Sequence, residues 1–269
     1  MSFRTEPLHE DFGVVIEGLD PARYADPEVV AFVREAIARH KLILVRNATL
    51  DATQQVGFAR ILGDIARRGP SIPATGTHSF VSNRVVGGQL PEGELYFHSD
   101  QTYFDPPLKA LSLYAILVPS SGGDTLFTDA TLAWERLPDE TKATVSGLRA
   151  FHAHDYSGRK YARDTRGQID LSRPDAVSAT HPIVWEHPDL RRPVLLVNRS
   201  QTQHVVDLDP DEGRRLLEAL YAHIEDPAHV YTHRWVPGDL LLWDNWGLQH
   251  ARTEWPAGEG RTLRRVPIM

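Results

Sequence analysis

Hydrophobic and polar positions follow two different patterns over the first 65 residues. Residues 12–18 and 42–45 are short, mostly apolar runs, which are typical of β-strands. Residues 27–40 instead place apolar side chains along one side of a helical repeat, which predicts an amphipathic helix. A second helix is expected over 51–62, because Thr49 or Asp51 at its start can act as an N-cap.

Short strands dominate the rest of the chain. The stretch of about 67–95 is rich in Gly, Pro, Ser and Asn, which predicts one long loop, and long loops inside compact domains are often functional. The strands that we expect after it cover residues 110–118, 124–128, 148–154, 194–197, 230–235, 240–243 and 262–268. The helices expected between them cover residues 130–137, 139–148 and 209–223. Many short strands separated by turns predict a barrel or a jelly roll with flanking helices, a mixed α and β fold.

Composition and charge narrow the range of functions. The 269 residues, 41% of them hydrophobic, can form one sizeable core, so we expect a single domain over 1–269. A net charge of −7 disfavours nucleic acid and anionic membranes as partners. The absence of cysteine means that any metal must be held by nitrogen and oxygen atoms. Because no signal peptide or membrane-length apolar run is evident, we expect a cytoplasmic protein.

The chain has 13 histidines, and one of them stands in a metal-binding pattern. His98 and Asp100 are two positions apart, so in an extended segment their side chains lie on the same face and can converge. His250, which follows a turn and an apolar run, is the best candidate for a third ligand. Two histidines and one carboxylate form the facial triad of non-haem Fe(II) oxygenases. Unrelated surface histidines are the alternative, and we interpret His152 and His154 as structural or surface groups.

A second pattern lies near the C-terminal end. If residues 261–265 form a strand, Arg261 and Arg265 lie on one face and Arg264 lies on the other. Two guanidinium groups that face a barrel interior require an anionic partner, and a carboxylate is the natural one. A solvated basic tail is the alternative, because arginine side chains are usually exposed.

Several short motifs occur in a fixed order along the chain. They are Phe97-His98-Ser99-Asp100, Pro106-Pro107, Pro119-Ser120-Ser121-Gly122-Gly123-Asp124-Thr125, His181-Pro182-Ile183-Val184, Leu196-Val197-Asn198, Pro237-Gly238-Asp239, Trp243-Asp244-Asn245, His250 and Arg261. In this order the chain, from about residue 12 to residue 269, resembles the Fe(II)- and 2-oxoglutarate-dependent dioxygenases of the taurine dioxygenase and chlorophenoxyacetate dioxygenase type. The resemblance implies a double-stranded β-helix, a cupin-like jelly roll, with flanking helices.

The resemblance also implies roles for individual residues. The iron ligands that it implies are His98, Asp100 and His250. The distal carboxylate of 2-oxoglutarate would meet Arg261 and the Thr125 hydroxyl, and Arg265 matches the position that binds the anionic group of taurine. The implied reaction consumes 2-oxoglutarate and O2, releases succinate and CO2, and oxidises a C–H bond. The outcome is hydroxylation, which fragmentation can follow, or desaturation of the substrate.

The substrate is expected to be a small molecule. Arg265 favours a carboxylate, sulfonate or sulfate ester, whereas Glu94 would favour an amine, so an amino-acid derivative would satisfy both. Asn83, Tyr96 and Phe97, in or beside the long loop, are further candidates for the pocket. Core packing is an equally good explanation for the two aromatic residues. By resemblance we also expect self-association into a homo-oligomer.

Two functions of other classes stay open at this point. The first is a non-catalytic jelly-roll sensor that binds a metal or a small acid, although such a protein would not need three iron ligands together with Arg261. The second is a zinc hydrolase with the same ligands, which would need a general base near the metal. The chain contains no His-Glu-x-x-His motif to supply that base.

Overall fold

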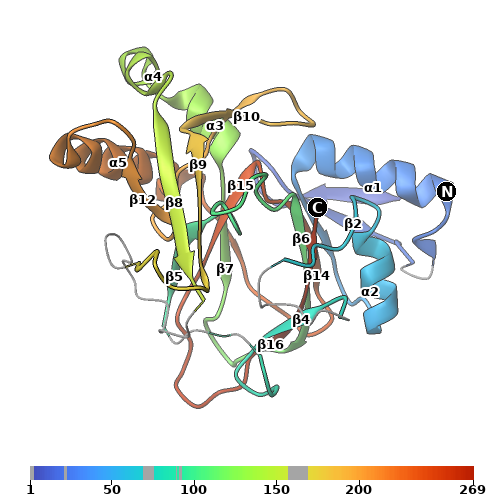
Figure 1. Cartoon of the computed structure of the whole chain (residues 1–269). Helices are drawn as coiled ribbons and strands as arrows, with labels where there is room; N and C mark the ends of the chain where they lie inside the picture. Colours follow the sequence, from blue (N-terminus) through green and yellow to red (C-terminus); the bar gives the residue numbers. More distant parts are fainter. Residues whose placement is uncertain (1–2, 21–22, 69–75, 89, 91–92, 157–168) are drawn as a thin grey trace.

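Two sheets lie face to face at the centre of the computed structural model, which describes residues 3–20, 23–68, 76–88, 90, 93–156 and 169–269 (Figure 1). The larger sheet has the strand order β1 (Arg4–Pro7), β2 (Val14–Glu17), β3 (Leu42–Val45), β14 (Leu240–Asp244), β6 (Ala110–Leu117), β16 (Thr262–Ile268) and β4 (Ser79–Ser82). The smaller sheet has the order β13 (Tyr231–His233), β7 (Thr125–Asp129), β15 (Leu248–Arg252) and β5 (Leu95–His98).

The space between the two sheets is filled by apolar side chains. Leu44, Trp243 and Leu263 of the larger sheet belong to the same buried cluster as Phe127 and Leu248 of the smaller one. Neighbouring strands in both sheets are antiparallel, apart from the parallel pair β2 and β3. Two packed, mainly antiparallel sheets are the arrangement of a jelly roll.

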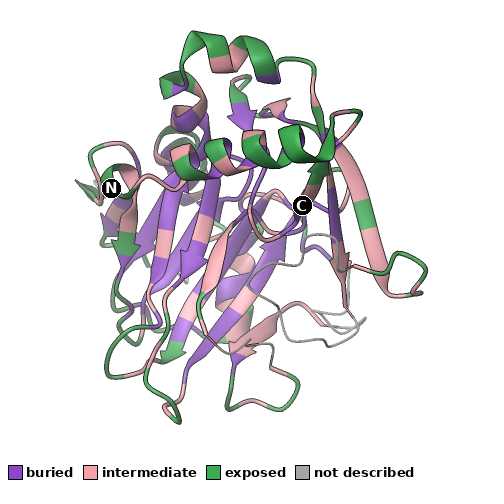
Figure 2. Ribbon diagram, turned by 90° about the vertical axis from the view of Figure 1, so that its left-hand side faces the viewer, coloured by how far each residue is buried: buried purple, intermediate pink, exposed green. Residues whose placement is uncertain are grey.

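Two helices cover the outer face of the larger sheet. They are α1 (Pro27–His40) and α2 (Ala52–Ala59). Val33 of α1 and Phe58 of α2 belong to a separate buried cluster, which also contains Ile43 and Leu242 of the larger sheet. Each helix begins where the sequence predicts, because Asp26 caps α1 and the Asp51 side chain forms a capping box with Gln54 at the start of α2. Burial follows the sheets in Figure 2, whereas the outer helix faces are exposed.

A third layer extends from the jelly roll. It contains the sheet β12 (Thr202–Val205), β8 (Arg149–Asp155) and β9 (Ala176–Pro182), and the pair β10 (Val184–Glu186) and β11 (Pro193–Leu195). Its helices are α3 (Ala130–Arg136), α4 (Asp139–Val145), α5 (Pro210–Ile224) and the short η2 (Pro227–His229). Among the described residues, none of the helices combines the length and apolar character that crossing a lipid bilayer requires.

Some strands differ from the sequence expectation. The stretch of about 67–95, expected to be one loop, contains β4, which pairs with β16 at the edge of the larger sheet. The strands β1, β5, β9, β10, β12 and β15 were not expected either. They are short, and ladder hydrogen bonds to neighbouring strands hold them in place. Residues 69–75, 89 and 91–92 of the expected loop lie outside the described residues.

Candidate active site

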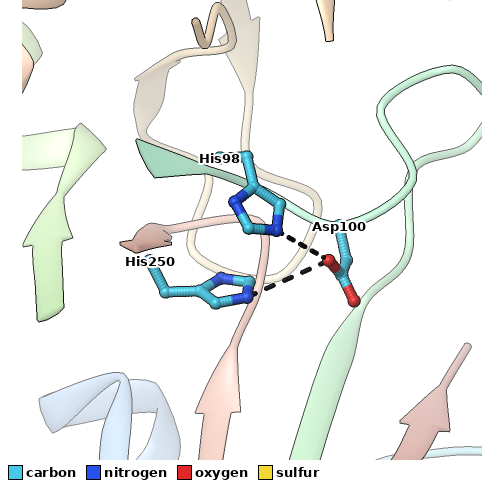
Figure 3. A group of neighbouring side chains, drawn as sticks. All are labelled: His98, Asp100 and His250. Carbon is cyan, nitrogen blue, oxygen red and sulfur yellow. Dashed lines mark ion pairs between the residues drawn. The ribbon is translucent and has the colours of Figure 1, made fainter. Parts of the chain in front are cut away.

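Two histidines stand opposite each other on neighbouring strands of the smaller sheet. His98 is the last residue of β5, and it pairs in register with His250 of the antiparallel strand β15. Side chains of directly opposed residues lie on the same face of a sheet, and the two ring centroids are 4.3 Å apart. Asp100 follows β5, and its Oδ1 atom lies 3.1 Å from His98 Nε2 and 3.9 Å from His250 Nε2 (Figure 3).

The donor set of this group fits a metal ion. One ligand atom from each residue lies within 4.8 Å of the others, and no other such group occurs among the described residues. His98 Nδ1 donates to the Tyr96 carbonyl oxygen at 2.8 Å, so Nε2, which faces Asp100, is the ring nitrogen that can bind a metal. Burial, and next the charge of His98, lower the pKa of His250 to about 3, so its ring is neutral as a ligand must be.

Arg265 controls the charge of the third ligand. Its Nη2 atom donates to Asp100 Oδ2 at 2.5 Å. Burial alone would raise the pKa of Asp100, but the Arg265 charge and the His98 hydrogen bond outweigh burial and hold that pKa well below its usual range. Asp100 is therefore a carboxylate at neutral pH. Arg265 Nη1 is buried and has no hydrogen-bond partner within the described part of the chain.

The backbone around Asp100 is held by a buried amide. Asn245, which is fully buried, accepts from Asp100 N at 2.8 Å and donates to Asp100 O at 3.0 Å and to Leu108 O at 2.7 Å. Two residues further on, Thr102 N and Oγ1 donate to Gln201 Oε1 at 3.0 and 2.8 Å. Gln201 N in turn donates to Asn198 Oδ1 at 2.8 Å. The Trp-Asp-Asn and Leu-Val-Asn motifs thus support the segment that carries the carboxylate.

A cavity of about 150 Å³ is lined by these three residues. Thr125 and Arg252, which pair in register on neighbouring strands, line it together with Arg261. Arg261 is only 2% exposed, its Nε atom donates to Gly123 O at 3.0 Å, and its Nη1 atom has no partner among the described residues. Burial, and next the charge of Arg252, lower the pKa of Arg261 to about 9. The surroundings of Arg261 are therefore suited to an anion.

Aromatic side chains line the cavity as well. Tyr103 stacks on His154 at 4.7 Å between ring centroids, and Tyr156 meets His154 edge-on at 4.5 Å. The Tyr156 hydroxyl donates to the Tyr103 hydroxyl at 2.9 Å. Burial is the main cause that lowers the pKa of His154 to about 4, so this wall is uncharged at neutral pH.

The structure brings most of the expected site residues together. His98, Asp100, Thr125, His250, Arg261 and Arg265 all line the cavity. Arg264 points the other way, as alternation predicts, and its Nε atom donates to Gln55 Oε1 at 2.6 Å.

Four expected pocket residues, Asn83, Glu94, Tyr96 and Phe97, are not among those lining the cavity, which corrects that expectation. A register shift between β5 and β15 turns Leu95 and His98 inward, so the two residues between them do not line the cavity. Asn83 accepts from Arg261 N at 2.9 Å and donates to Glu259 O at 2.8 Å, so it supports the segment just before β16 that carries Arg261.

Sequence reasoning missed other lining residues, among them Tyr103, His154, Tyr156, Gln201 and Arg252. For Arg252 a signal existed, because it lies two residues after His250 and therefore on the same face of a strand. For His154 and Tyr156 no local signal existed, since β8 belongs to another sheet and reaches the cavity only through the tertiary fold.

Comparison with known proteins connects this geometry to a family. Residues 4–266 match the model of the taurine catabolism dioxygenase TauD, TfdA family. The chain belongs to this family. It is 30% identical to an (S)-phenoxypropionate/alpha-ketoglutarate-dioxygenase of Sphingobium herbicidovorans, over 97% of this chain and 93% of the relative. It is 28% identical to an alpha-ketoglutarate-dependent sulfate ester dioxygenase of Pseudomonas putida, over 97% and 88% of the two chains.

Solved structures of similar proteins have the same fold. A taurine dioxygenase from Burkholderia xenovorans superposes with a TM-score of 0.82 at 28% identity, covering 100% of this chain and 89% of the other. The structure of AAD-2 in complex with Mn(II) and N-oxalylglycine superposes with a TM-score of 0.81 at 27% identity, covering 100% of this chain and 97% of the other. The expected jelly-roll core and enzyme class are confirmed: the protein is a 2-oxoglutarate-dependent dioxygenase, for which family membership implies Fe(II), 2-oxoglutarate and O2.

Proposed function

We propose that this dioxygenase oxidises a C–H bond of a small anionic substrate, with His98, Asp100 and His250 as its iron ligands. The observation that carries the proposal is the cavity, which is lined by two imidazoles and one carboxylate together with Arg261 and Arg265. When bound, iron with 2-oxoglutarate and O2 supplies the oxidising equivalent, and succinate and CO2 are released. The rest of the reaction depends on how the side chains hold the two organic molecules.

Thr125 and Arg261 would bind the distal carboxylate of 2-oxoglutarate. Trp235 Nε1 donates to Thr125 Oγ1 at 2.9 Å, so the hydroxyl proton of Thr125 points elsewhere and can be donated to a carboxylate. Arg261 Nη1, buried and without a partner among the described residues, can donate to the same group. A carboxylate here would also compensate the buried positive charge.

Arg265 would hold the anionic group of the substrate. Its Nη2 atom is bonded to Asp100, whereas its buried Nη1 atom has no partner in the described part of the chain and can receive a carboxylate, sulfonate or sulfate. Relatives named for a phenoxypropionate and for sulfate esters support an anion. The body of the substrate would lie against Tyr103, His154 and Tyr156, which form an uncharged aromatic wall.

The sequence favoured an amino group on the substrate because of Glu94, but Glu94 does not line the cavity. We therefore favour a simple organic anion over an amino-acid derivative. The product would be an alcohol, or the fragment that forms when the oxidised carbon bears a heteroatom. Self-association and a cytoplasmic location stay predictions from the sequence.

Anaerobic titration followed by turnover tests the proposal. The apoprotein is titrated with Fe(II) and 2-oxoglutarate while the visible charge-transfer band of the chelate is monitored, and candidate anions are then added. We expect a band that Arg261→Gln weakens, and succinate formation with at least one carboxylate, sulfonate or sulfate ester after O2 is admitted. A protein that forms the band but never forms succinate with any anion would be the sensor, and the proposal would then be wrong.

A further inference from the structure

Two glutamines line the cavity, and the reaction described above gives neither of them a role. Gln101 directly follows Asp100, and Gln201 directly precedes β12. Both residues are buried, with 4% and 6% of their surface exposed. A side-chain amide has an acceptor oxygen at one end and an N–H2 donor at the other, so its effect on a substrate depends on which end is already in use.

The amide oxygen of Gln201 is held by Thr102. Thr102 N and Oγ1 donate to Gln201 Oε1 at 3.0 and 2.8 Å, and Asn198 Nδ2 donates to Thr102 Oγ1 at 3.4 Å. A backbone N–H can only donate, so the atom that it meets must be the amide oxygen. The orientation of this amide is therefore fixed, and its Nε2 atom donates to no atom of the described residues.

Gln101 is held in the same way by an arginine. Arg68 Nε, which can only donate, bonds to Gln101 Oε1 at 2.8 Å. The arginine is itself held, because its Nη1 atom donates to Pro106 O at 2.7 Å and its guanidinium carbon lies 4.7 Å from the ring centroid of Phe104. Here too the oxygen is in use, and Gln101 Nε2 donates to no atom within the described part of the chain.

The backbone at Gln101 has an uncommon conformation. Its φ angle is 61°, in the left-handed region that residues other than glycine seldom adopt. Consecutive side chains of an extended strand point to opposite faces, whereas Asp100 and Gln101 both line the cavity. Such conformations persist where the surrounding structure imposes them, and they concentrate at functional sites. The turn places an amide donor beside the carboxylate.

The two amide donors require an acceptor. A buried N–H without a partner costs free energy, which a ligand with an acceptor atom recovers. The anionic group of the substrate is already assigned to Arg265, so the amides are left for another part of the same molecule. A hydrocarbon body offers no acceptor, whereas an ether, ester or carbonyl oxygen has lone pairs for one or both donors.

We propose that Gln101 and Gln201 are specificity-determining residues, whose Nε2 atoms donate to an oxygen in the body of the substrate. Anions that contain such an oxygen are thereby favoured over hydrocarbon anions of the same shape. The inference rests on the proposed function, the oxidation of a small anion. Residues that only supported the segment around Asp100 would affect both kinds of anion equally.

The test compares anions that differ by one oxygen. Phenoxyacetate is paired with 3-phenylpropanoate, and 3-propoxypropane-1-sulfonate with heptane-1-sulfonate, so that CH2 replaces oxygen in the second member of each pair. Each anion is added without O2 to protein that holds Fe(II) and 2-oxoglutarate, and the change in the charge-transfer band gives its Kd.

The variants separate the donor from the rest of each side chain. Gln101→Met and Gln201→Met, alone and combined, remove the amides and keep a similar length. Gln201→Glu keeps an oxygen for Thr102 and removes only the N–H2 donor. Gln54→Met is the matched control, because that glutamine belongs to the capping box of α2 and does not line the cavity.

We expect the unchanged protein to bind the oxygen-containing member of at least one pair about tenfold more tightly. This preference should fall to about threefold in each single variant, disappear in the double variant and stay in Gln54→Met. Equal binding, or no binding, of both members of each pair by the unchanged protein would overturn the inference, as would a preference that survives in the double variant. The proposed function fails separately, if no band forms or no anion yields succinate.

Discussion

The indole N–H of Trp235 donates to the Thr125 hydroxyl oxygen at 2.9 Å inside the core. Because this bond uses the oxygen as an acceptor, the hydroxyl proton stays available for donation to a group in the cavity that Thr125 lines. We expect Trp235→Phe, which removes only the N–H donor and some volume, to raise the Kd of 2-oxoglutarate about fivefold, in line with one hydrogen bond of about 1 kcal/mol. Titration of protein loaded with Mn(II), which supports no oxidation, measures this Kd.

Thr125→Val supplies the control for that prediction. Once the hydroxyl is absent, Trp235 has nothing to orient, so adding Trp235→Phe should change the Kd little further. If the two substitutions have independent, additive effects, Trp235 acts by packing alone and the orienting role is wrong.

The two imidazoles are expected to be indispensable for metal binding. His98→Ala or His250→Ala leaves two protein ligands, so we expect bound iron to fall from about one atom per chain to almost none after dialysis. His204→Ala, at an exposed position, should keep full iron content. Elemental analysis with a parallel thermal unfolding curve separates metal loss from unfolding. Retention of stoichiometric iron in His250→Ala would mean that the metal is held elsewhere.

Asn245 connects stability to metal affinity. Asn245→Ala removes its hydrogen bonds with Asp100 N, Asp100 O and Leu108 O at a fully buried position. We expect the free energy of unfolding to fall by about 3 kcal/mol, at about 1 kcal/mol for each bond, and iron affinity to fall about 10- to 100-fold as Asp100 loses its support. Urea unfolding and competitive chelation measure the two quantities. A loss of stability with unchanged iron affinity would limit Asn245 to a structural role.

Stability in acid should depend on His152. Burial, and next the charge of His181, lower the pKa of His152 to about 3 in the folded protein. The unfolded chain binds this proton near pH 6.5, so the free energy of unfolding decreases as the pH falls from about 6.5 toward 3 and is unaffected above that range. Protonation of His152 changes the free energy of unfolding by at most about 1.4 kcal/mol per pH unit.

Urea unfolding at pH 7, 6, 5 and 4 tests this dependence. In His152→Gln the loss of stability between pH 6 and 4 should be smaller than in the unchanged protein, although the variant is less stable at pH 7 because it loses core packing. His204→Ala, at an exposed position, should keep the original slope. Parallel curves for all three proteins would show that His152 contributes nothing to acid unfolding.

Local signals predicted some elements well. The helix expected over 27–40 is α1, Pro27–His40, because apolar spacing and an Asp cap act within a few residues of sequence. The strand expected over 42–45 is β3, a continuous apolar run. The edge strand β4 could not be predicted, because its half-buried Ser79-Phe80-Val81-Ser82 owes its conformation to the ladder with β16.

The sequence by itself determined which chemical groups are available: nitrogen and oxygen ligands, a His-x-Asp pair that one extended segment can present on one face, and arginines spaced by strand alternation. Only the tertiary structure decided that β5 and β15 pair with His98 opposite His250, and that Arg252 and His154 reach the same cavity. The physical reason is that side-chain direction is a local property of a strand, whereas register and neighbours are set by hydrogen bonds and packing between segments far apart in the chain.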